Sequence, residues 1–164
     1  MDRRVMKVFI SCCLQALVLV SSGEILRERY EAEFEQEVVD YSTSNDLVSP
    51  KCMGCICQVE SGCNRGKGCR MDVGSLSCGP FQIKEAYWID CGRPGGNYQS
   101  CTKDYNCAYG CVQKYMARYI HSSGCPGNCE SYARIHNGGP RGCTNPNTLG
   151  YWHKMMTKGC TRNS

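Results

Sequence analysis

The stretch CMGCICQVESGCNRGKGCRMDVGSLSC, residues 52–78, carries the strongest structural signal in this 164-residue chain. Six of its residues are cysteine, and eight more cysteines follow between Cys91 and Cys160. An even number of cysteines at this density predicts a framework of up to seven disulfide bonds in an oxidising compartment. Such bonds suit a small domain, because its core is modest and each native bond typically adds about 2–4 kcal/mol.

The first three of these cysteines also allow a metal-binding interpretation. The spacing Cys52-x-x-Cys55-x-Cys57 is close to that of a zinc-ligand cluster. An exported chain favours disulfides over zinc, since thiols become oxidised along the secretory route. Apart from this cluster, the sequence indicates no metal and no organic cofactor.

The N-terminus supports export. Residues 1–23 begin with the basic Arg3, Arg4 and Lys7, continue with an apolar run over residues 8–20, and end in small residues. This is the pattern of a secretory signal peptide, and the apolar run is too short to cross a bilayer comfortably. We therefore expect a cleaved signal and a secreted, extracellular protein without a membrane anchor.

Charge divides the remaining chain into two parts. Residues 24–49 hold eight acidic and two basic residues and no cysteine, whereas residues 50–164 hold fourteen basic and six acidic residues. The first part predicts an acidic N-terminal arm, or a pro-segment that screens the basic domain that follows. A basic secreted domain suits an anionic partner such as bacterial cell wall, nucleic acid or heparin, and charge alone does not choose among them.

Residues 50–164 predict one mostly helical domain with a small antiparallel β-hairpin, an α+β class. Apolar spacing and boundary residues predict helices over residues 50–60, 104–121, 128–136 and 149–158. The segment 70–81 predicts the hairpin, with Gly74-Ser75 near its turn, and residues 81–83 can add a strand.

Two acidic residues have surroundings that suit hydrolysis of a glycosidic bond. That reaction needs one carboxyl group that stays protonated and another that stays ionised. Glu60 ends an apolar helix beside Val59, where burial favours the neutral acid. Asp72 lies on a hairpin rich in Gly and Ser, whose N–H and O–H groups can hold a carboxylate. From these residues alone, both acids can also be ordinary surface charges.

Longer motifs add to this interpretation. They are C-Q-V-E-S-G-C at 57–63, C-R-M-D-V-G-S-L-S-C-G-P-F-Q-I-K at 69–84, Y-W-I-D-C-G at 87–92, C-V-Q-K-Y-M-A-R-Y at 111–119, H-N-G-G-P-R-G-C at 136–143 and G-Y-W at 150–152. Together they resemble the invertebrate-type lysozymes, the destabilase group, over about Pro50 to Cys160. The resemblance implies a disulfide-rich, lysozyme-like fold. It also implies hydrolysis of the β-1,4 bond between N-acetylmuramic acid and N-acetylglucosamine in bacterial peptidoglycan, for antibacterial defence or digestion.

The resemblance implies a role for each matching residue. Glu60 is the implied acid and Asp72 the implied nucleophile of a retaining mechanism, which places the two carboxyl groups about 5–5.5 Å apart. The implied disulfides include Cys57–Cys63 and Cys69–Cys78. The implied substrate-binding residues are Lys84, Tyr87, Trp88, Ile89, Asp90, Tyr115, His136, Asn137 and Gly138. Aromatic residues in this set also suit a small core, and a lone histidine is more often structural.

Two other functions stay open. Members of the resembled family also cleave isopeptide bonds, for which Ser75 with Lys84 is the implied pair, and His121, His136 and His153 are further candidate bases. The second alternative is a non-catalytic cationic protein that binds bacterial wall. We expect peptidoglycan as the partner and no nucleic acid, while the oligomeric state and most disulfide pairs stay undetermined.

Overall fold

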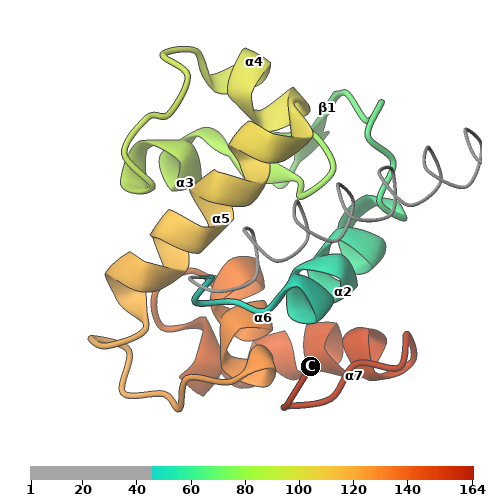
Figure 1. Cartoon of the computed structure of the whole chain (residues 1–164), viewed down its shortest axis with the longest axis vertical. Coiled ribbons are helices and arrows are strands. Elements are labelled where there is room, and N and C mark those ends of the chain that lie inside the picture. Colours follow the sequence, from blue (N-terminus) through green and yellow to red (C-terminus); the bar gives the residue numbers. More distant parts are fainter. Residues whose placement is uncertain (1–45) are drawn as a thin grey trace, which may run out of the picture. The chain divides into compact units, whose positions relative to one another are not determined.

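The computed structural model describes residues 46–164, so the predicted signal peptide and nearly all of the acidic arm lie outside the described residues. The order of elements confirms the α+β class, with mostly helices and one small sheet that lies beside α4 (Figure 1). The elements are α2 (Pro50–Ser61), β1 (Cys69–Asp72), β2 (Ser75–Cys78), β3 (Ile83–Lys84), α3 (Glu85–Asp90), α4 (Tyr98–Lys103), α5 (Tyr105–Tyr119), α6 (Cys129–Gly138), the 3-10 helices η1 (Gly142–Thr144) and η2 (Pro146–Thr148), and α7 (Leu149–Met156).

Three predicted helices begin where polar side chains can satisfy the free N–H groups of a first turn. Ser49 caps α2, Asp104 caps α5 and Asn128 caps α6, each accepting a hydrogen bond from a backbone N–H three residues later. The α2 helix ends at Gly62, which has a φ of 66° and donates its N–H back to helix carbonyls. Glu60 therefore lies in the last turn of α2, as predicted.

The hairpin is shorter than the predicted segment 70–81 and covers residues 69–78. Its two turn residues are Val73 and Gly74, with φ angles of 45° and 76°, which matches a type I′ turn. This turn pairs Asp72 with Ser75, so Ser75 already belongs to the second strand. The additional strand is present, but it begins at Ile83, and the sheet order is β1-β2-β3 with antiparallel pairing.

Helix α5 lies between two groups of elements (Figure 1). It contacts α3 and α4, which lie beside the sheet, and it contacts α6, which packs against α2 and α7. Its buried face carries apolar side chains spaced by one helical turn, which explains why this helix joins both groups. These residues are Ala108, Cys111, Val112, Tyr115 and Met116. Within residues 46–164, no helix has the length and apolar character of a membrane span.

Residues just before Pro50 also belong to the folded domain. Val48 is fully buried, and the side-chain amide of Gln113 bonds its N–H at 3.0 Å and its carbonyl at 2.7 Å. The Tyr109 hydroxyl donates to the Asp46 carboxylate at 2.7 Å. The segment 46–49, which the charge pattern grouped with the acidic arm, therefore packs against α5.

Seven disulfides connect all fourteen cysteines of the domain. The pairs are Cys52–Cys129, Cys55–Cys160, Cys57–Cys63, Cys69–Cys78, Cys91–Cys111, Cys101–Cys107 and Cys125–Cys143. The two pairs implied by the resemblance are confirmed. The zinc interpretation is wrong, because each sulfur of the proposed ligand cluster is bonded to another cysteine. Two of the bonds join α2 to α6 and to the segment after α7, and they hold the helix that carries Glu60.

Candidate active site

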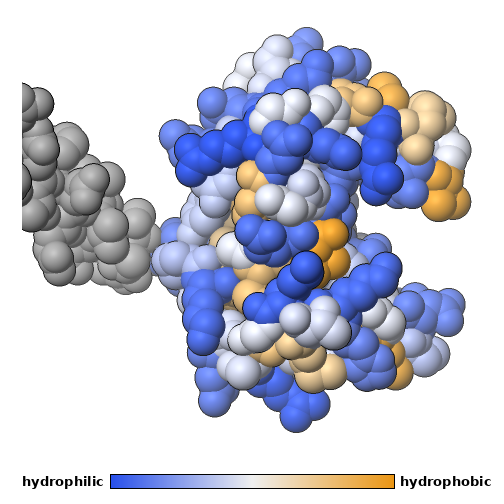
Figure 2. Space-filling view, turned by 90° about the vertical axis from the view of Figure 1, so that its right-hand side faces the viewer, coloured by the Kyte–Doolittle hydropathy of each residue, from blue (hydrophilic) through white to orange (hydrophobic). Residues whose placement is uncertain are grey.

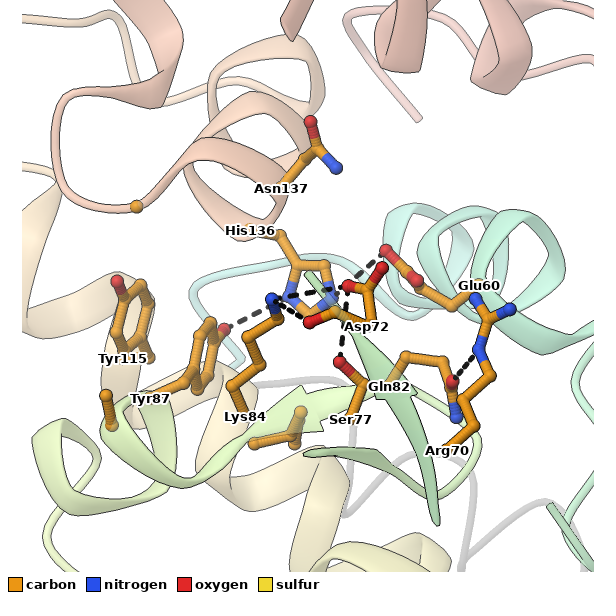
Figure 3. A pocket seen from close by; sticks show the side chains of 13 residues that line it. Glu60, Arg70, Asp72, Ser77, Gln82, Lys84, Tyr87, Tyr115, His136 and Asn137 are labelled. Carbon is orange, nitrogen blue, oxygen red and sulfur yellow. Dashed lines mark hydrogen bonds and ion pairs between the residues drawn. The ribbon is translucent and has the colours of Figure 1, made fainter. Parts of the chain in front are cut away.

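A cavity of about 230 Å³ lies between the sheet and α6 (Figure 3). Its lining comes from the end of α2, the three strands, α3, α5 and α6. Figure 2 shows that the surface of the described domain is hollowed on one side. The structure brings seven predicted site residues to this cavity: Glu60, Asp72, Lys84, Tyr87, Tyr115, His136 and Asn137.

The sheet supplies one charged wall of the cavity. In the strand register, Arg70 on β1 lies opposite Ser77 on β2, which lies opposite Lys84 on β3. Asp72 is two residues beyond Arg70, so its side chain leaves the same face of the sheet. All four residues line the cavity. Two cations and one carboxylate are therefore held on a single rigid surface.

Asp72 is half-exposed and has polar neighbours. One of its carboxyl oxygens lies 3.3 Å from the Lys84 ammonium nitrogen and 3.5 Å from the Ser77 hydroxyl. Lys84 also donates to the backbone carbonyl of Asp72 at 3.0 Å. A cation and a hydroxyl next to one oxygen stabilise a negative charge on this carboxyl group. The Gly- and Ser-rich hairpin thus supplies such a donor in Ser77, as expected.

Glu60 has different surroundings. Its side chain is only 16% exposed, compared with 44% for Asp72. The nearest polar group is the imidazole of His136, whose Nε2 lies 3.6 Å from a Glu60 oxygen. Figure 3 shows the Glu60 and Asp72 carboxyl groups reaching into the same cavity from α2 and β1. The two acids therefore face the same cavity in different surroundings. Glu60 is largely enclosed, whereas Asp72 is more exposed and lies beside the Lys84 cation.

The hydrogen bonds of His136 define its protonation. Its Nε2 faces the carbonyl oxygen of Phe81 at 3.0 Å, and its Nδ1 faces the Tyr87 hydroxyl at 3.2 Å. A carbonyl only accepts, so Nε2 carries the hydrogen and Nδ1 accepts from Tyr87. Burial lowers the pKa of His136, against the opposing effects of Glu60 and of the Phe81 carbonyl. The ring is thus a neutral N–H donor that also faces Glu60.

A pair of aromatic rings forms another wall. Tyr87 and Tyr115 are stacked, with ring centroids 3.5 Å apart and planes within 10°. Burial raises the pKa of both hydroxyls, and for Tyr87 the neighbouring Tyr115 and Glu60 add to this. Both side chains therefore stay uncharged phenols, able to donate hydrogen bonds near neutral pH. The core interpretation of Tyr87 holds as well, since only 8% of the residue is exposed.

Four predicted substrate-binding residues do not line this cavity: Trp88, Ile89, Asp90 and Gly138. Trp88 packs in the core and donates its indole N–H to the carbonyl of Pro94 at 3.0 Å. Gly138 packs against Thr148, whose Cγ2 would lie 2.5 Å from an added Cβ. The neighbouring Gly139 lines the cavity in its place. Substrate contacts by these four residues stay predictions.

Other lining residues were not singled out by the sequence analysis. Arg70 and Gln82 are joined by a hydrogen bond of 2.8 Å between Nε and Oε1, and both reach the cavity. The position of Arg70, two residues before Asp72 on a predicted strand, was a usable signal. No such signal existed for Gln82, which lies in a loop, or for Ala86, which lies in a six-residue helix, because neither element is long enough to show a clear apolar period.

The implied isopeptidase pair is also near Asp72. The Ser75 hydroxyl lies 3.4 Å and the Lys84 nitrogen 3.0 Å from the same Asp72 carbonyl oxygen. The two side chains thus converge on one atom from β2 and β3. Within the described residues, no hydrogen bond joins them directly, and Ser75 is not among the residues that line the cavity.

Comparisons with known proteins agree with this fold. Residues 49–159 match the Destabilase family. A lysozyme from Magallana gigas is 63% identical over 117 residues, which cover 71% of this chain and 85% of that protein. An invertebrate-type lysozyme from Ruditapes philippinarum is 54% identical, covering 74% of this chain and 88% of the relative.

Solved structures show the same relationship. The crystal structure of an inhibitor-bound lysozyme from Meretrix lusoria superposes with a TM-score of 0.70 at 56% identity, covering 73% of this chain and 98% of that one. A crystal structure of Tapes japonica lysozyme has a TM-score of 0.69 at 54% identity, covering 73% of this chain and 98% of that one. The chain therefore belongs to the Destabilase family and is an invertebrate-type lysozyme, a glycoside hydrolase.

Proposed function

We propose that the protein hydrolyses the β-1,4 bond between N-acetylmuramic acid and N-acetylglucosamine in peptidoglycan, with Glu60 as the general acid and Asp72 as the second carboxylate. The observation that carries the assignment is that both carboxyl groups line one cavity in unlike surroundings. Glycoside hydrolysis requires this division, because one group gives a proton while the other supports positive charge on the sugar.

The proposed reaction has two steps. Glu60 protonates the glycosidic oxygen as the bond to the sugar breaks, and Asp72 attacks the anomeric carbon or stabilises the cation that forms there. Glu60 then takes a proton from water, which attacks the same carbon from the face that the leaving group occupied. This sequence retains the anomeric configuration, and it predicts carboxyl groups about 5–5.5 Å apart.

The proposed substrate contacts follow from the cavity walls. Lys84 and Asn137 offer polar groups at the cavity surface, and Tyr87 and Tyr115 offer phenol groups and ring edges. His136 holds the Tyr87 hydroxyl in place while its other ring nitrogen faces the acid. A sugar chain needs both kinds of group, because its rings have apolar faces and hydroxyl-bearing edges.

We also propose that the protein is secreted and acts on bacteria, in defence or digestion. Seven disulfides persist in oxidising compartments and are rare in reducing ones. The excess of basic residues after Pro50 favours attraction to an anionic bacterial wall. The signal peptide that would direct export lies outside the described residues and stays a prediction.

The test is clearing of a peptidoglycan suspension by the oxidised protein, followed as turbidity. Glu60→Gln and Asp72→Asn replace each acid with a neutral amide of the same size, and we expect each to lose nearly all activity. Glu85→Gln is the matched control, because Glu85 is exposed and outside the cavity. Full activity in a folded Glu60→Gln or Asp72→Asn variant would remove that residue from the mechanism.

A second measurement tests the stereochemistry. Proton NMR of a short chitin-type oligosaccharide during hydrolysis reveals which anomer forms first. We expect the β-anomer, as retention requires. An initial α-anomer would mean inversion, and Asp72 would then act as a base for water rather than as a nucleophile.

Isopeptide hydrolysis is a second candidate activity. It is favoured by the convergence of Ser75 and Lys84 on the Asp72 carbonyl. In this reaction the Ser75 oxygen would bond the amide carbon, and its hydroxyl proton would pass to the lysine nitrogen, which leaves as the free amine. Water would then hydrolyse the resulting ester to a carboxylic acid and restore the Ser75 hydroxyl. Release of amine from a γ-glutamyl-lysine peptide tests it, and unchanged release by Ser75→Ala would exclude Ser75.

A further inference from the structure

The Tyr151 side chain on α7 has an unusual environment. The residue is only 8% exposed, and its hydroxyl oxygen is buried. Among the described residues, it is the buried side-chain polar atom that has no hydrogen-bond partner. A buried hydroxyl without a partner costs folding free energy, since its bonds to water are lost and not replaced. A phenylalanine ring would fill the same space without this cost.

The hydroxyl is close to the proposed acid. Helix α7 packs against α2, and the Cys55–Cys160 disulfide joins α2 to the segment that follows α7. Burial raises the pKa of the Tyr151 hydroxyl well above its usual value, and the adjacent Glu60 carboxyl raises it further. The group therefore stays a protonated donor, and the Glu60 carboxyl is the side-chain acceptor beside it. The contact between them is longer or more bent than an ordinary hydrogen bond, so the hydroxyl has no partner of normal geometry.

We propose that Tyr151 is a positioning residue for Glu60, whose hydroxyl donates to one carboxyl oxygen during catalysis and so keeps the proton on the other. The inference rests on the proposed role of Glu60 as the acid. A carboxylic acid can rotate about its last bond and can carry its proton on either oxygen. A hydroxyl that donates to one Glu60 oxygen keeps the proton off that oxygen. The proton then stays on the other oxygen, which faces the sugar.

The charge change in the reaction strengthens this contact. When Glu60 gives up its proton it becomes a carboxylate, and a hydrogen bond to a charged acceptor is stronger than one to a neutral acid. The donor therefore stabilises the state after proton transfer more than the state before it, which is how a group increases turnover rather than binding. The His136 N–H, 3.6 Å from a Glu60 oxygen, faces the same carboxyl group from α6.

The test is Tyr151→Phe, which removes one oxygen and keeps the ring. We expect kcat on a soluble oligosaccharide to fall about tenfold, or about 1.4 kcal/mol of barrier, with KM changed less than twofold and the melting temperature unchanged or higher. Tyr132→Phe is the control, because Tyr132 is a buried tyrosine on α6 whose hydroxyl, unlike that of Tyr151, is not influenced by Glu60, and we expect no change in kcat. Loss of activity together with loss of thermal stability would overturn the proposal, as would full activity.

The pH profile supplies a readout that a structural role would not move. Removing a donor from the carboxylate favours the protonated acid, so the basic limb of kcat/KM should move to higher pH in Tyr151→Phe. The other titratable or charged groups around the cavity are His136, Tyr87, Asp72, Lys84 and Arg70. They are the same in the wild type and in Tyr151→Phe, so they do not account for a difference between the two profiles. An unmoved basic limb would overturn the proposal.

A second variant keeps the test independent of folding. Replacement of Tyr151 by 3-fluorotyrosine keeps the hydroxyl and makes it a stronger donor, so the basic limb should move to lower pH. An opposite movement, or none, would overturn the proposal. Failure of the proposed role of Glu60 gives a different result, because the Glu60→Gln variant would then be as active as the wild-type protein.

Discussion

Gly79→Ala provides a quantitative test of how the sheet is held in place. Gly79 follows β2 and has a φ of 74°, and a Cβ added there would lie 1.6 Å from the carbonyl oxygen of Thr102 in α4. Contacts below 3.0 Å are not tolerated, so the two backbones must separate by more than an ångström. Gly74, at the tip of the hairpin, has nearly the same φ of 76° but no atom within 4 Å of its added Cβ.

The pair of glycines separates two costs. An alanine at positive φ costs about 1–2 kcal/mol wherever it stands, and this is the whole expected effect of Gly74→Ala. Forcing packed backbone apart adds typically about 1–3 kcal/mol, so Gly79→Ala should cost about 2–5 kcal/mol. The shift also moves the strand that carries Ser77 and, through its partners, the strands that carry Asp72 and Lys84.

Urea unfolding of the oxidised protein, followed by circular dichroism, measures both variants against the wild type. We expect the midpoint to fall for both and clearly further for Gly79→Ala. Only Gly79→Ala should also lose turnover of peptidoglycan, because the charged wall of the cavity moves with the sheet. Equal stability of the two variants would refute the reasoning that contact with the α4 backbone fixes the sheet.

Three further changes test other parts of the structure. Burial lowers the pKa of His136, so its contribution to stability is present above the ordinary histidine pKa and is lost as pH falls. In urea unfolding, the unfolding free energy of His136→Gln should therefore decrease less between pH 7 and pH 5 than that of the wild type. Glu130 pairs with Arg134 at 3.1 Å and with Arg162 at 2.6 Å, so Glu130→Gln should cost about 3–5 kcal/mol at pH 7, because the largely buried Arg134 loses its carboxylate. Although burial raises its pKa, those two arginines lower it further overall, so the deficit should shrink at pH 3. Val73→Asn should gain about 1 kcal/mol in urea unfolding, because asparagine tolerates the φ of 45° that strains valine.

The helices that could be predicted are those with strong local signals. Ser49, Asp104 and Asn128 are capping residues whose side chains bond the first turn whatever the rest of the chain does. The six-residue helices α3 and α4 were not predicted. They are too short for an apolar stripe to recur, and their conformation depends on packing against α5 and the sheet.

The sequence by itself determined the fold class, the disulfide-rich character of the domain and the two acids as candidates, because these follow from cysteine spacing, local periodicity and a motif. The tertiary structure decided which side chains share the cavity. Arg70, Ser77 and Lys84 lie in one row only because of the strand register. The sequence of a single strand does not show which residues of its neighbour it pairs with.

Distance along the chain was the other limit. Glu60 lies near His136 and Tyr151, which are far away in the sequence and come from α6 and α7. Likewise, Trp88 follows Tyr87 directly, yet one packs against Pro94 and the other reaches the cavity. Neighbours in a helix point in different directions, and which direction meets the cavity is set by how the helices pack rather than by the residues themselves.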